Sequence, residues 1–403
     1  MNRVAIVGVG LVSSLGNSWK SVRDSLYLSK SGIRVNESYI EKGLRSHVSG
    51  HIDCPEVENI DRKLRRFMGT NGEWCHIAME QAVAQAGLSQ EQLSSEDTTL
   101  IVGAGGVASD DLVDAITVLN EQGIKRVGPY RVTREMGSAP SAQLATNFKV
   151  RGPSYSISSA CATSAHCIGT GYQQIKMGLI KTAIAGGVDQ AHWSHAMQFD
   201  GMGALSTQFN EQPEKASRPY DKHRDGFVIS AGAGIVILEE WEHAKQRGAN
   251  ILGEVIGFGA SSDGDNMVAP SGEGAERAIK IALKDAGDVK IDYINTHGTS
   301  TPRGDVTELK AIENVFKDDV PYISSTKSLS GHGLGAAGVH ETIFSLIMMN
   351  EGFICASANA DDVEEEIQHL PLVRQRLDQK VETVLSNSFG FGGTNACLVF
   401  KSA

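Results

Sequence analysis

Cysteine is scarce in this 403-residue sequence, and its six copies form no CxxC pair. They lie far apart along the chain, at Cys54, Cys75, Cys161, Cys167, Cys355 and Cys397. This spacing argues against a disulfide framework of the kind found in small secreted domains. It also argues against a structural zinc centre, which needs clustered cysteine and histidine ligands. We therefore predict neither disulfides nor a metal site.

Long apolar runs and an excess of positive charge are also missing. No stretch approaches the ~20 apolar residues that a membrane helix needs. The apolar opening segment Met1–Gly10 is too short and too interrupted by glycine for a signal peptide. The net charge of −11 disfavours general binding to nucleic acid. We expect a cytoplasmic protein that binds neither membranes nor nucleic acid.

Short β-rich runs alternate with helical patterns along the chain. The predicted strands are Val4–Val9, Thr99–Val102, Tyr155–Ile157, Thr182–Ala185, Gly234–Glu239, Gly253–Gly259, Asp292–Asn295, Val384–Asn387 and Ala396–Phe400. The predicted helices include Thr70–Ala86, Ser164–Met177, Glu273–Asp285 and Val339–Met349. Such alternation is typical of an α/β fold with largely parallel sheets.

Two distant segments resemble each other and suggest a chain built from two related halves. Residues Tyr155–Ser159 lead through a turn at Cys161 into a helix rich in small residues. Residues Tyr322–Thr326 lead through a turn at His332 into another helix of this kind. Self-similarity within a chain is the sign of repeated structural units. We place the boundary near residues 248–252 and expect halves 1–249 and 250–403.

Cys161 lies where a predicted strand ends and a predicted helix begins. A thiol at a helix N-terminus faces unpaired backbone N–H groups and the positive end of the helix dipole, which stabilise a thiolate. A free cysteine is also often a small buried apolar residue without a chemical role. Local sequence leaves both interpretations of Cys161 open, whereas Cys167 is interpreted as core packing.

Three further turns rich in Gly, Ser and Thr follow predicted β runs. Two contain a histidine: His297 in Asn295–Pro302 and His332 in Lys327–Gly333. A lone loop histidine is usually structural, but active sites of α/β proteins gather at the carboxyl ends of strands. The third turn, Asn387–Asn395, can aim backbone N–H groups at an anion or oxyanion. Alone, it fits a phosphate cradle or a tight hairpin equally well.

Four motifs together carry a resemblance to a known family. They are Ser159–Ser164, His297–Pro302, Thr326–His332 and Asn387–Asn395. In this order and spacing they resemble the β-ketoacyl-acyl carrier protein (ACP) synthases, and the likeness runs nearly from end to end. Segments Ser156–Gly169, Pro213–Val228 and Asp263–Gly274 look most like the bacterial type I enzymes. The resemblance implies a thiolase-like α/β fold whose two pseudo-repeated halves form a layered αβαβα architecture.

The resemblance also implies a mechanism. Cys161 attacks an acyl-ACP thioester and becomes acylated. Malonyl-ACP then loses CO2, and the resulting carbanion attacks the acyl group to give 3-oxoacyl-ACP, longer by two carbons. His297 and His332 stabilise the charge that decarboxylation creates, while the backbone N–H groups of Cys161 and Phe391 form an oxyanion hole. No cofactor is implied beyond the phosphopantetheine arm that carries the substrates.

Further residues take their expected roles from the same resemblance. Lys327 matches an active-site lysine and Glu341 an acidic residue near it, although the two could form only a structural ion pair. The implied substrate-binding residues are Thr299, Thr301, Phe227, Phe389 and Glu341. Phe391 is expected to gate the acyl pocket. Asp305 and Glu308 are interpreted as structural.

Basic residues gain a role because ACP is acidic and needs a local positive patch on an acidic enzyme. The implied docking residues are Lys63, Arg66, Lys125 and Arg126. Without the resemblance, these charges would be read as a solvated face. The family also implies a homodimer.

Alternative families fit less well. A thiolase needs a second catalytic cysteine in a Cys-x-Gly turn, whereas Cys397 lies inside the last predicted strand. Type III synthases place asparagine where His332 stands, and chain-length factors lack the nucleophile. A cysteine hydrolase needs no second histidine. Departures from the type I pattern leave the preferred acyl chain length open; they lie at Ala108–Leu112, Val188–Gln190, His192–His195 and Gln198.

Overall fold

The computed structural model describes all residues from Met1 to Ala403 and is built around one ten-stranded sheet. Its strands are β1 (Val4–Ser13), β4 (Thr98–Ala104), β5 (Ser154–Tyr155), β6 (Thr182–Asp189), β7 (Gly232–Glu240), β8 (Gly253–Ser262), β9 (Tyr293–Asn295), β10 (Tyr322–Ser324), β11 (Thr383–Gly390) and β12 (Thr394–Lys401). A small second sheet pairs β2 (Ile33–Val35) with β3 (Val48–Gly50). Each of the nine predicted strands overlaps an observed one.

The large sheet consists of two halves with the same strand order. One half runs β1-β7-β6-β4-β5 and the other β8-β12-β11-β9-β10. The orientation of neighbouring strands also repeats, with two antiparallel pairs followed by two parallel pairs. The halves join through the antiparallel pair β1–β8. The structure therefore has the two pseudo-repeated halves of the expected thiolase-like fold.

The expectation of largely parallel sheets is wrong, because antiparallel pairing dominates the centre of the sheet. Strands β6, β7, β1, β8, β12 and β11 are successively antiparallel, and only the outer strands pair in parallel. A parallel connection needs a crossover element that packs on the sheet. The hairpin β11–β12 has no such element. The β6–β7 connection contains α11 (Trp193–Gly201), which packs mainly against α6 (Ser109–Gln122) instead.

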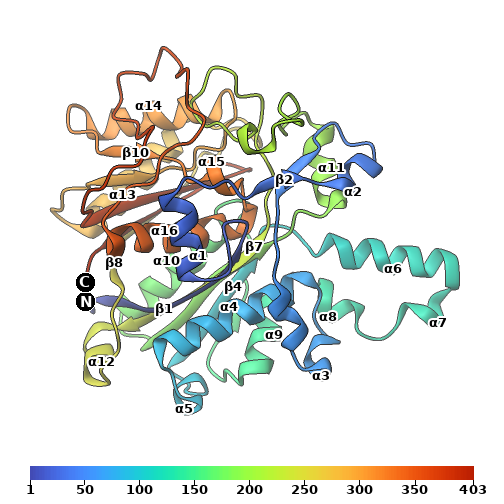
Figure 1. Ribbon diagram of the computed structural model, residues 1–403. Helices are drawn as coiled ribbons and strands as arrows, with labels where there is room; N and C mark the ends of the chain where they lie inside the picture. Colours follow the sequence, from blue (N-terminus) through green and yellow to red (C-terminus); the bar gives the residue numbers. More distant parts are fainter.

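Helices form three layers around the two halves (Figure 1). The four predicted helices correspond within two residues at each end to α4 (Thr70–Ala86), α10 (Thr163–Lys176), α13 (Glu273–Ala286) and α16 (Ala337–Glu351). In the central layer, α10 and α16 contact each other and strands of both halves. On the outer faces, α4 and α9 (Ala139–Phe148) cover the first half, while α13 and α14 (Gly304–Phe316) cover the second.

Most of the shorter helices lie at the periphery of these layers, whereas the short segments Lys327–Ser330 and Leu334–Ala336 are buried. The shorter helices are α1 (Trp19–Tyr27), α2 (Glu37–Glu41), α3 (Arg62–Arg65), α5 (Gln90–Leu93), α7 (Ile124–Val127), α8 (Arg131–Glu135), α12 (Trp241–Gln246) and α15 (Lys327–Ser330), with 3-10 turns η1 (Pro55–Asn59), η2 (Pro213–Lys215) and η3 (Leu334–Ala336). None of the helices combines the length and the apolar character that crossing a bilayer requires.

Glycine lets each outer helix lie directly against its strand, in the same way in both halves. A Cβ atom added at Gly10 of β1 would lie 1.9 Å from the carbonyl oxygen of Ala78 in α4. A Cβ atom added at Gly259 of β8 would lie 2.1 Å from the carbonyl oxygen of Ala278 in α13. Only a residue without a side chain permits this approach. The two halves thus share a strand–helix packing mode as well as a strand order.

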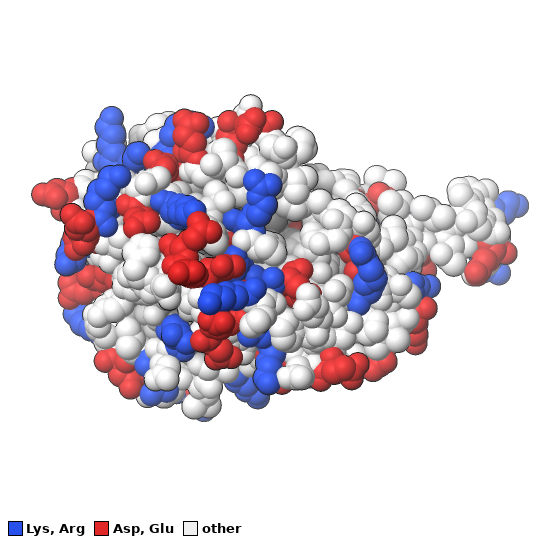
Figure 2. Space-filling view, turned by 90° about the horizontal axis from the view of Figure 1, so that it is seen from above, with Lys and Arg blue, Asp and Glu red and all other residues white.

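Helices α6 and α7 form an arm that projects from the body of the molecule (Figure 1). Acidic and basic side chains are interspersed over the face shown in Figure 2, and charged groups gather again at the tip of the arm. Between the tip and the body, the arm is mostly uncharged in this view.

Candidate active site

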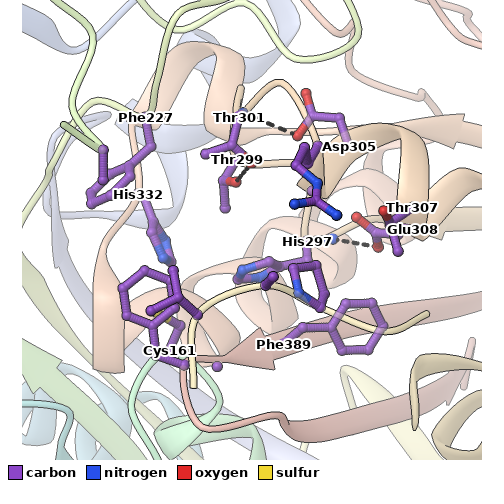
Figure 3. Close-up of a pocket in the computed structure, with 18 of the residues that line it drawn as sticks. Cys161, Phe227, His297, Thr299, Thr301, Asp305, Thr307, Glu308, His332 and Phe389 are labelled. Carbon is purple, nitrogen blue, oxygen red and sulfur yellow. Dashed lines mark hydrogen bonds between the residues drawn. The ribbon is translucent and has the colours of Figure 1, made fainter. Parts of the chain in front are cut away.

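One cavity of about 500 Å³ brings together the residues expected to carry the chemistry. Cys161 from the first half meets His297 and His332 from the second (Figure 3). The remaining expected residues in its wall are Thr299, Thr301, Phe227, Phe389 and Phe391. Each of these side chains lies in a segment next to the end of a strand. Because those strands belong to both halves of the sheet, the two halves build the site jointly.

A strained turn presents Cys161 to the cavity. The preceding Ala160 has a φ of +49°, in the left-handed region that residues with a Cβ rarely adopt. The end of β11 lies close against this turn, since a Cβ added at Gly390 would be 2.8 Å from the Ser159 carbonyl oxygen and 3.2 Å from the Cys161 nitrogen. Glycine at position 390 therefore allows the Phe391 turn to approach the thiol.

The electrostatics of Cys161 differ from the simple helix-terminus expectation. Burial raises the pKa of the thiol to about 12, and the charge of Asp189 acts in the same direction. The charge of Lys327 and the backbone N–H groups of Phe391 and Cys161 lower this pKa without offsetting the rise. The backbone N–H groups lower the pKa of the thiol, as expected, but burial raises this pKa by more. The free enzyme therefore holds a protonated thiol.

The two histidine rings lie face to edge, with centroids 5.2 Å apart and an interplanar angle of 88°. Burial lowers the pKa of both imidazoles well below the usual range, and the charge of Lys327 lowers both further. Each Nδ1 is buried without a hydrogen-bond partner. Both rings are consequently neutral near pH 7, and neither is held by a hydrogen bond at its Nδ1.

Buried carboxylates hold the turns that carry these side chains. Glu308 of α14 accepts hydrogen bonds from the backbone N–H groups of His297 and Gly298, both at 2.8 Å. Asp305 accepts from the backbone N–H groups of Ser300 and Thr301, at 3.1 and 3.3 Å (Figure 3). The structure thus gives both acidic residues a role in ordering backbone, in keeping with their structural interpretation.

Aromatic rings and hydroxyl groups line the rest of the cavity near the histidines. The Phe227 ring lies 5.4 Å from the His332 ring, and the Phe389 ring lies 5.8 Å from the His297 ring. The hydroxyl oxygens of Thr299 and Thr301 are 3.1 Å apart. Phe391 is 39% exposed at the tip of the β11–β12 turn.

Lys327 and Glu341 form a buried ion pair behind the cavity wall, and each side chain is only 2% exposed. Burial raises the pKa of Glu341 to about 7, while the lysine charge opposes that rise. The second carboxylate oxygen of Glu341 is buried without a partner. The charge of Lys327 acts on Cys161 and on both histidines, so the pair influences the site through space.

The expected docking residues are exposed but occupy two separate places. Lys63 and Arg66 lie at α3, and Lys125 and Arg126 lie in α7 at the end of the arm. Within one chain, the arm holds Lys125 and Arg126 at a distance from α3 (Figure 1).

Sequence reasoning missed other parts of the site. Phe199 of α11 lines the cavity, and its ring packs 5.3 Å from Phe227 and 6.2 Å from Phe391. Asp189 acts on the thiol although it was noted only as a departure from a pattern. The loop residues Asn266, Val268 and Pro270 also face the cavity. Their segment, Asp263–Gly274, resembles the family, but no local pattern in it indicates what it contacts.

Comparison with known protein families covers most of the chain. The family model described as beta-ketoacyl synthase, N-terminal domain, matches residues 1–244. The model described as beta-ketoacyl synthase, C-terminal domain, matches residues 252–361.

Individual relatives extend along the whole sequence. The 3-oxoacyl-[acyl-carrier-protein] synthase 1 of Haemophilus influenzae is 51% identical over 403 residues, covering 100% of this chain and 99% of that protein. The protein of the same description from Escherichia coli K12 has the same identity and coverage. The crystal structure of a beta-ketoacyl synthase from Burkholderia phymatum matches with a TM-score of 0.93 and 32% identity, covering 100% of both chains.

The buried ion pair provides a test of how the site is stabilised. Replacing Lys327 with Met leaves the Glu341 carboxylate buried without its cation, and we expect a loss of ~3–5 kcal/mol in the free energy of unfolding. The double variant Lys327→Met/Glu341→Leu should regain most of that stability without regaining activity. Urea denaturation measures the free energy of unfolding of both variants, and an activity assay compares them with the wild type. Equal stability of the single and double variants would contradict this account.

Proposed function

This chain belongs to the beta-ketoacyl synthase family, and we propose that Cys161 is the residue that carries its growing acyl chain. The protein is an acyltransferase of fatty acid synthesis that condenses acyl-ACP with malonyl-ACP to give 3-oxoacyl-ACP. Enzymes of this family need no cofactor beyond the phosphopantetheine arm of the substrate. The observation that carries the residue assignment is the single cavity in which one thiol faces two neutral imidazoles.

In the first half-reaction, the acyl group passes from the thiol of ACP to the thiol of Cys161. The thioester carbonyl lies against the N–H groups of Cys161 and Phe391, which stabilise the oxyanion that attack creates. Both N–H groups already act on the sulfur of the free enzyme. The thiol gives up its proton during attack, and the departing ACP thiolate takes one up. The products are acyl-Cys161 and free ACP.

In the second half-reaction, His297 and His332 stabilise the malonyl unit. Decarboxylation converts the malonyl thioester into an enolate, whose oxygen accepts hydrogen bonds from the two Nε2–H groups. Neutral imidazoles suit this role because they donate without a protonation equilibrium near pH 7. The enolate carbon then attacks acyl-Cys161, and the expelled thiolate takes up the proton that the reaction consumes.

The cavity wall guides the two substrates. Thr299 and Thr301 offer adjacent hydroxyl groups to the polar phosphopantetheine arm. Phe227 and Phe389 pack on the histidines and fix the orientation of the rings. The exposed Phe391 ring gates the acyl pocket, where it meets Phe199. Lys327, paired with Glu341, sets the potential felt by the thiol and the imidazoles.

ACP is the protein partner in this proposal. Lys63 and Arg66 supply positive charge at α3, and Lys125 with Arg126 supply it on the arm. An acidic partner approaching an enzyme with a net charge of −11 needs such local patches. None of these four exposed side chains forms an ion pair within the chain, although the Arg66 guanidinium lies over the rings of Phe67 and Tyr130.

The arm and the sheet edge support a homodimer. Several large apolar side chains are exposed on the arm or next to it: Ile116, Leu119, Ile124 and Val132. Strand β5 ends the sheet with both of its residues exposed, which leaves a strand edge without a partner. Exposed apolar surface beside an open edge is typical of a subunit interface. A second copy of this chain would cover both.

We take residues 249 and 250 as the boundary of the two halves, because β8 opens the second five-strand set shortly afterwards. We also propose a cytoplasmic location, since a catalytic thiol and five other free cysteines persist most readily in a reducing compartment.

Separating the two half-reactions tests the residue roles. Cys161→Ala should abolish condensation, whereas Cys161→Gln should still release CO2 from malonyl-ACP. His297→Ala should slow that decarboxylation by about 100- to 1000-fold, the usual effect of removing one oxyanion donor. Cys167→Ala, on the helix α10 that follows Cys161, is the matched control and should keep its activity. Normal elongation by Cys161→Ala would refute the central assignment.

Charge reversal tests the docking surface. The variants Lys63→Glu and Arg66→Glu should each raise the KM for acyl-ACP about tenfold at low salt, because they weaken electrostatic steering. The KM for an acyl thioester of free pantetheine should not change. Lys284→Glu on α13, which is exposed on another face, is the control. An equal rise for both kinds of substrate would argue against ACP docking at α3.

Sedimentation equilibrium tests the homodimer. The wild type should have twice the 43.0 kDa chain mass. Ile116→Glu combined with Ile124→Glu should raise the dimer dissociation constant by at least about tenfold, since it buries two carboxylates in the interface. Leu179→Glu, another exposed apolar position, should leave the mass unchanged. A monomeric wild type would rule out the proposed interface.

A further inference from the structure

His166 contacts the turn that carries Cys161, although it lies outside the cavity wall. It belongs to α10, and its Nδ1 is 2.9 Å from the hydroxyl oxygen of Ser159. The same Nδ1 is 3.1 Å from the carbonyl oxygen of Ala162. Ser159 and Ala162 are the residues on either side of the Ala160–Cys161 pair. One imidazole nitrogen therefore bridges both ends of the segment Ser159–Ala162, which we call the nucleophile turn.

These contacts fix which nitrogen of His166 carries the proton. A carbonyl oxygen only accepts hydrogen bonds, so Nδ1 must donate to Ala162. The hydroxyl oxygen of Ser159 shares that N–H in a three-centre hydrogen bond, of a kind common at helix ends. Burial lowers the pKa of His166 and so favours the neutral ring. Nδ1 also donates in the imidazolium, and the bridge therefore does not depend on pH.

A ring from the second half of the chain holds this imidazole in place. Phe258 of β8 packs edge-on against His166, with centroids 6.1 Å apart and an interplanar angle of 85°. Gly169, three positions further along α10, leaves room for that ring, because a Cβ added there would lie 2.3 Å from Cε2 of Phe258. Packing thus orients the imidazole toward its two acceptors.

The nucleophile turn needs support because its backbone is strained. Ala160 has a φ of +49°, a conformation that a residue with a Cβ keeps only where surrounding contacts impose it. Relaxation of Ala160 would reorient the next peptide and displace both the sulfur and the backbone N–H of Cys161. In the proposed mechanism that N–H is an oxyanion donor. A displacement of about 1 Å is enough to slow a reaction by about 100-fold.

Thr163 supports the same turn but reaches less of it. Its hydroxyl oxygen accepts a hydrogen bond from the backbone N–H of Ser159 at 2.8 Å. That contact holds the start of the turn, whereas the imidazole of His166 also holds the carbonyl oxygen of Ala162, where the turn ends.

We propose that His166 is a positioning residue for acyl transfer, because it holds both ends of the nucleophile turn and so fixes the sulfur and the N–H of Cys161. This inference rests on the proposed role of Cys161 as nucleophile. The two imidazoles that stabilise the malonyl unit lie on other turns. Loss of the His166 bridge therefore slows acylation of Cys161 and leaves decarboxylation of malonyl-ACP intact.

Two amide substitutions separate the hydrogen bonds of His166 from its packing. His166→Asn places a side-chain N–H near the position of Nδ1, whereas His166→Gln places it near that of Nε2. His166→Asn should acylate Cys161 from acyl-ACP within about threefold of the wild-type rate, and His166→Gln should be about 10- to 100-fold slower. Single-turnover acylation, followed by mass spectrometry of the intact protein, measures both rates. His369→Gln, at an exposed histidine paired with Glu313, is the control and should match the wild type.

A second readout distinguishes positioning from general damage to the fold. In a Cys161→Gln background, His166→Gln should release CO2 from malonyl-ACP at the rate of Cys161→Gln alone, because that step depends on His297 and His332. An equal loss of both activities, equally slow acylation by His166→Asn and His166→Gln, or wild-type acylation by His166→Gln would each overturn the proposal. If Cys161→Ala still condenses acyl-ACP with malonyl-ACP, the nucleophile assignment itself is wrong.

Discussion

The contact between helices α10 and α16 at the centre of the molecule is the constraint on which the site depends. The Ser164 hydroxyl accepts a hydrogen bond from the backbone N–H of Val339 at 2.9 Å. A Cβ added at Gly338 would lie 2.8 Å from the Ala165 nitrogen, so the helices meet backbone to backbone. Cys161 precedes one helix and His332 the other. Any loosening of this contact would separate the thiol from the imidazole, although the two residues belong to different halves.

Around this contact, acidic side chains accept hydrogen bonds from the backbone and so order its turns. Glu308, Asp305 and Asp189 each accept hydrogen bonds from consecutive or neighbouring N–H groups of the turns at the strand ends. Buried carboxylates serve this purpose well because charge-assisted hydrogen bonds are strong and directional. In the proposed mechanism, the chemistry is left to the Cys161 sulfur, two imidazoles and a few N–H groups, which these contacts hold in place.

Local sequence predicted the elements far better than their arrangement. The run Thr70–Ala86 is helical as expected, because apolar residues repeat along it and Gly87 ends it in a left-handed conformation. Strand pairing depends on partners far along the chain, so alternation alone suggested parallel sheets where β1, β7 and β8 pair antiparallel. Cys161 was ambiguous until its distant partners were considered together. The role of Asp189 stayed hidden because its hydrogen-bond partner Gly335 lies 146 positions away.

The raised pKa of Cys161 has a consequence for the durability of the resting enzyme. Oxidation to sulfenic acid, like metal capture, proceeds from thiolate, and susceptibility follows thiolate character and access. A thiol that stays protonated in its pocket is therefore expected to be a poor target for peroxide, even though in the proposed mechanism it attacks an acyl thioester. We therefore expect burial to protect the Cys161 sulfur of the resting enzyme from oxidation.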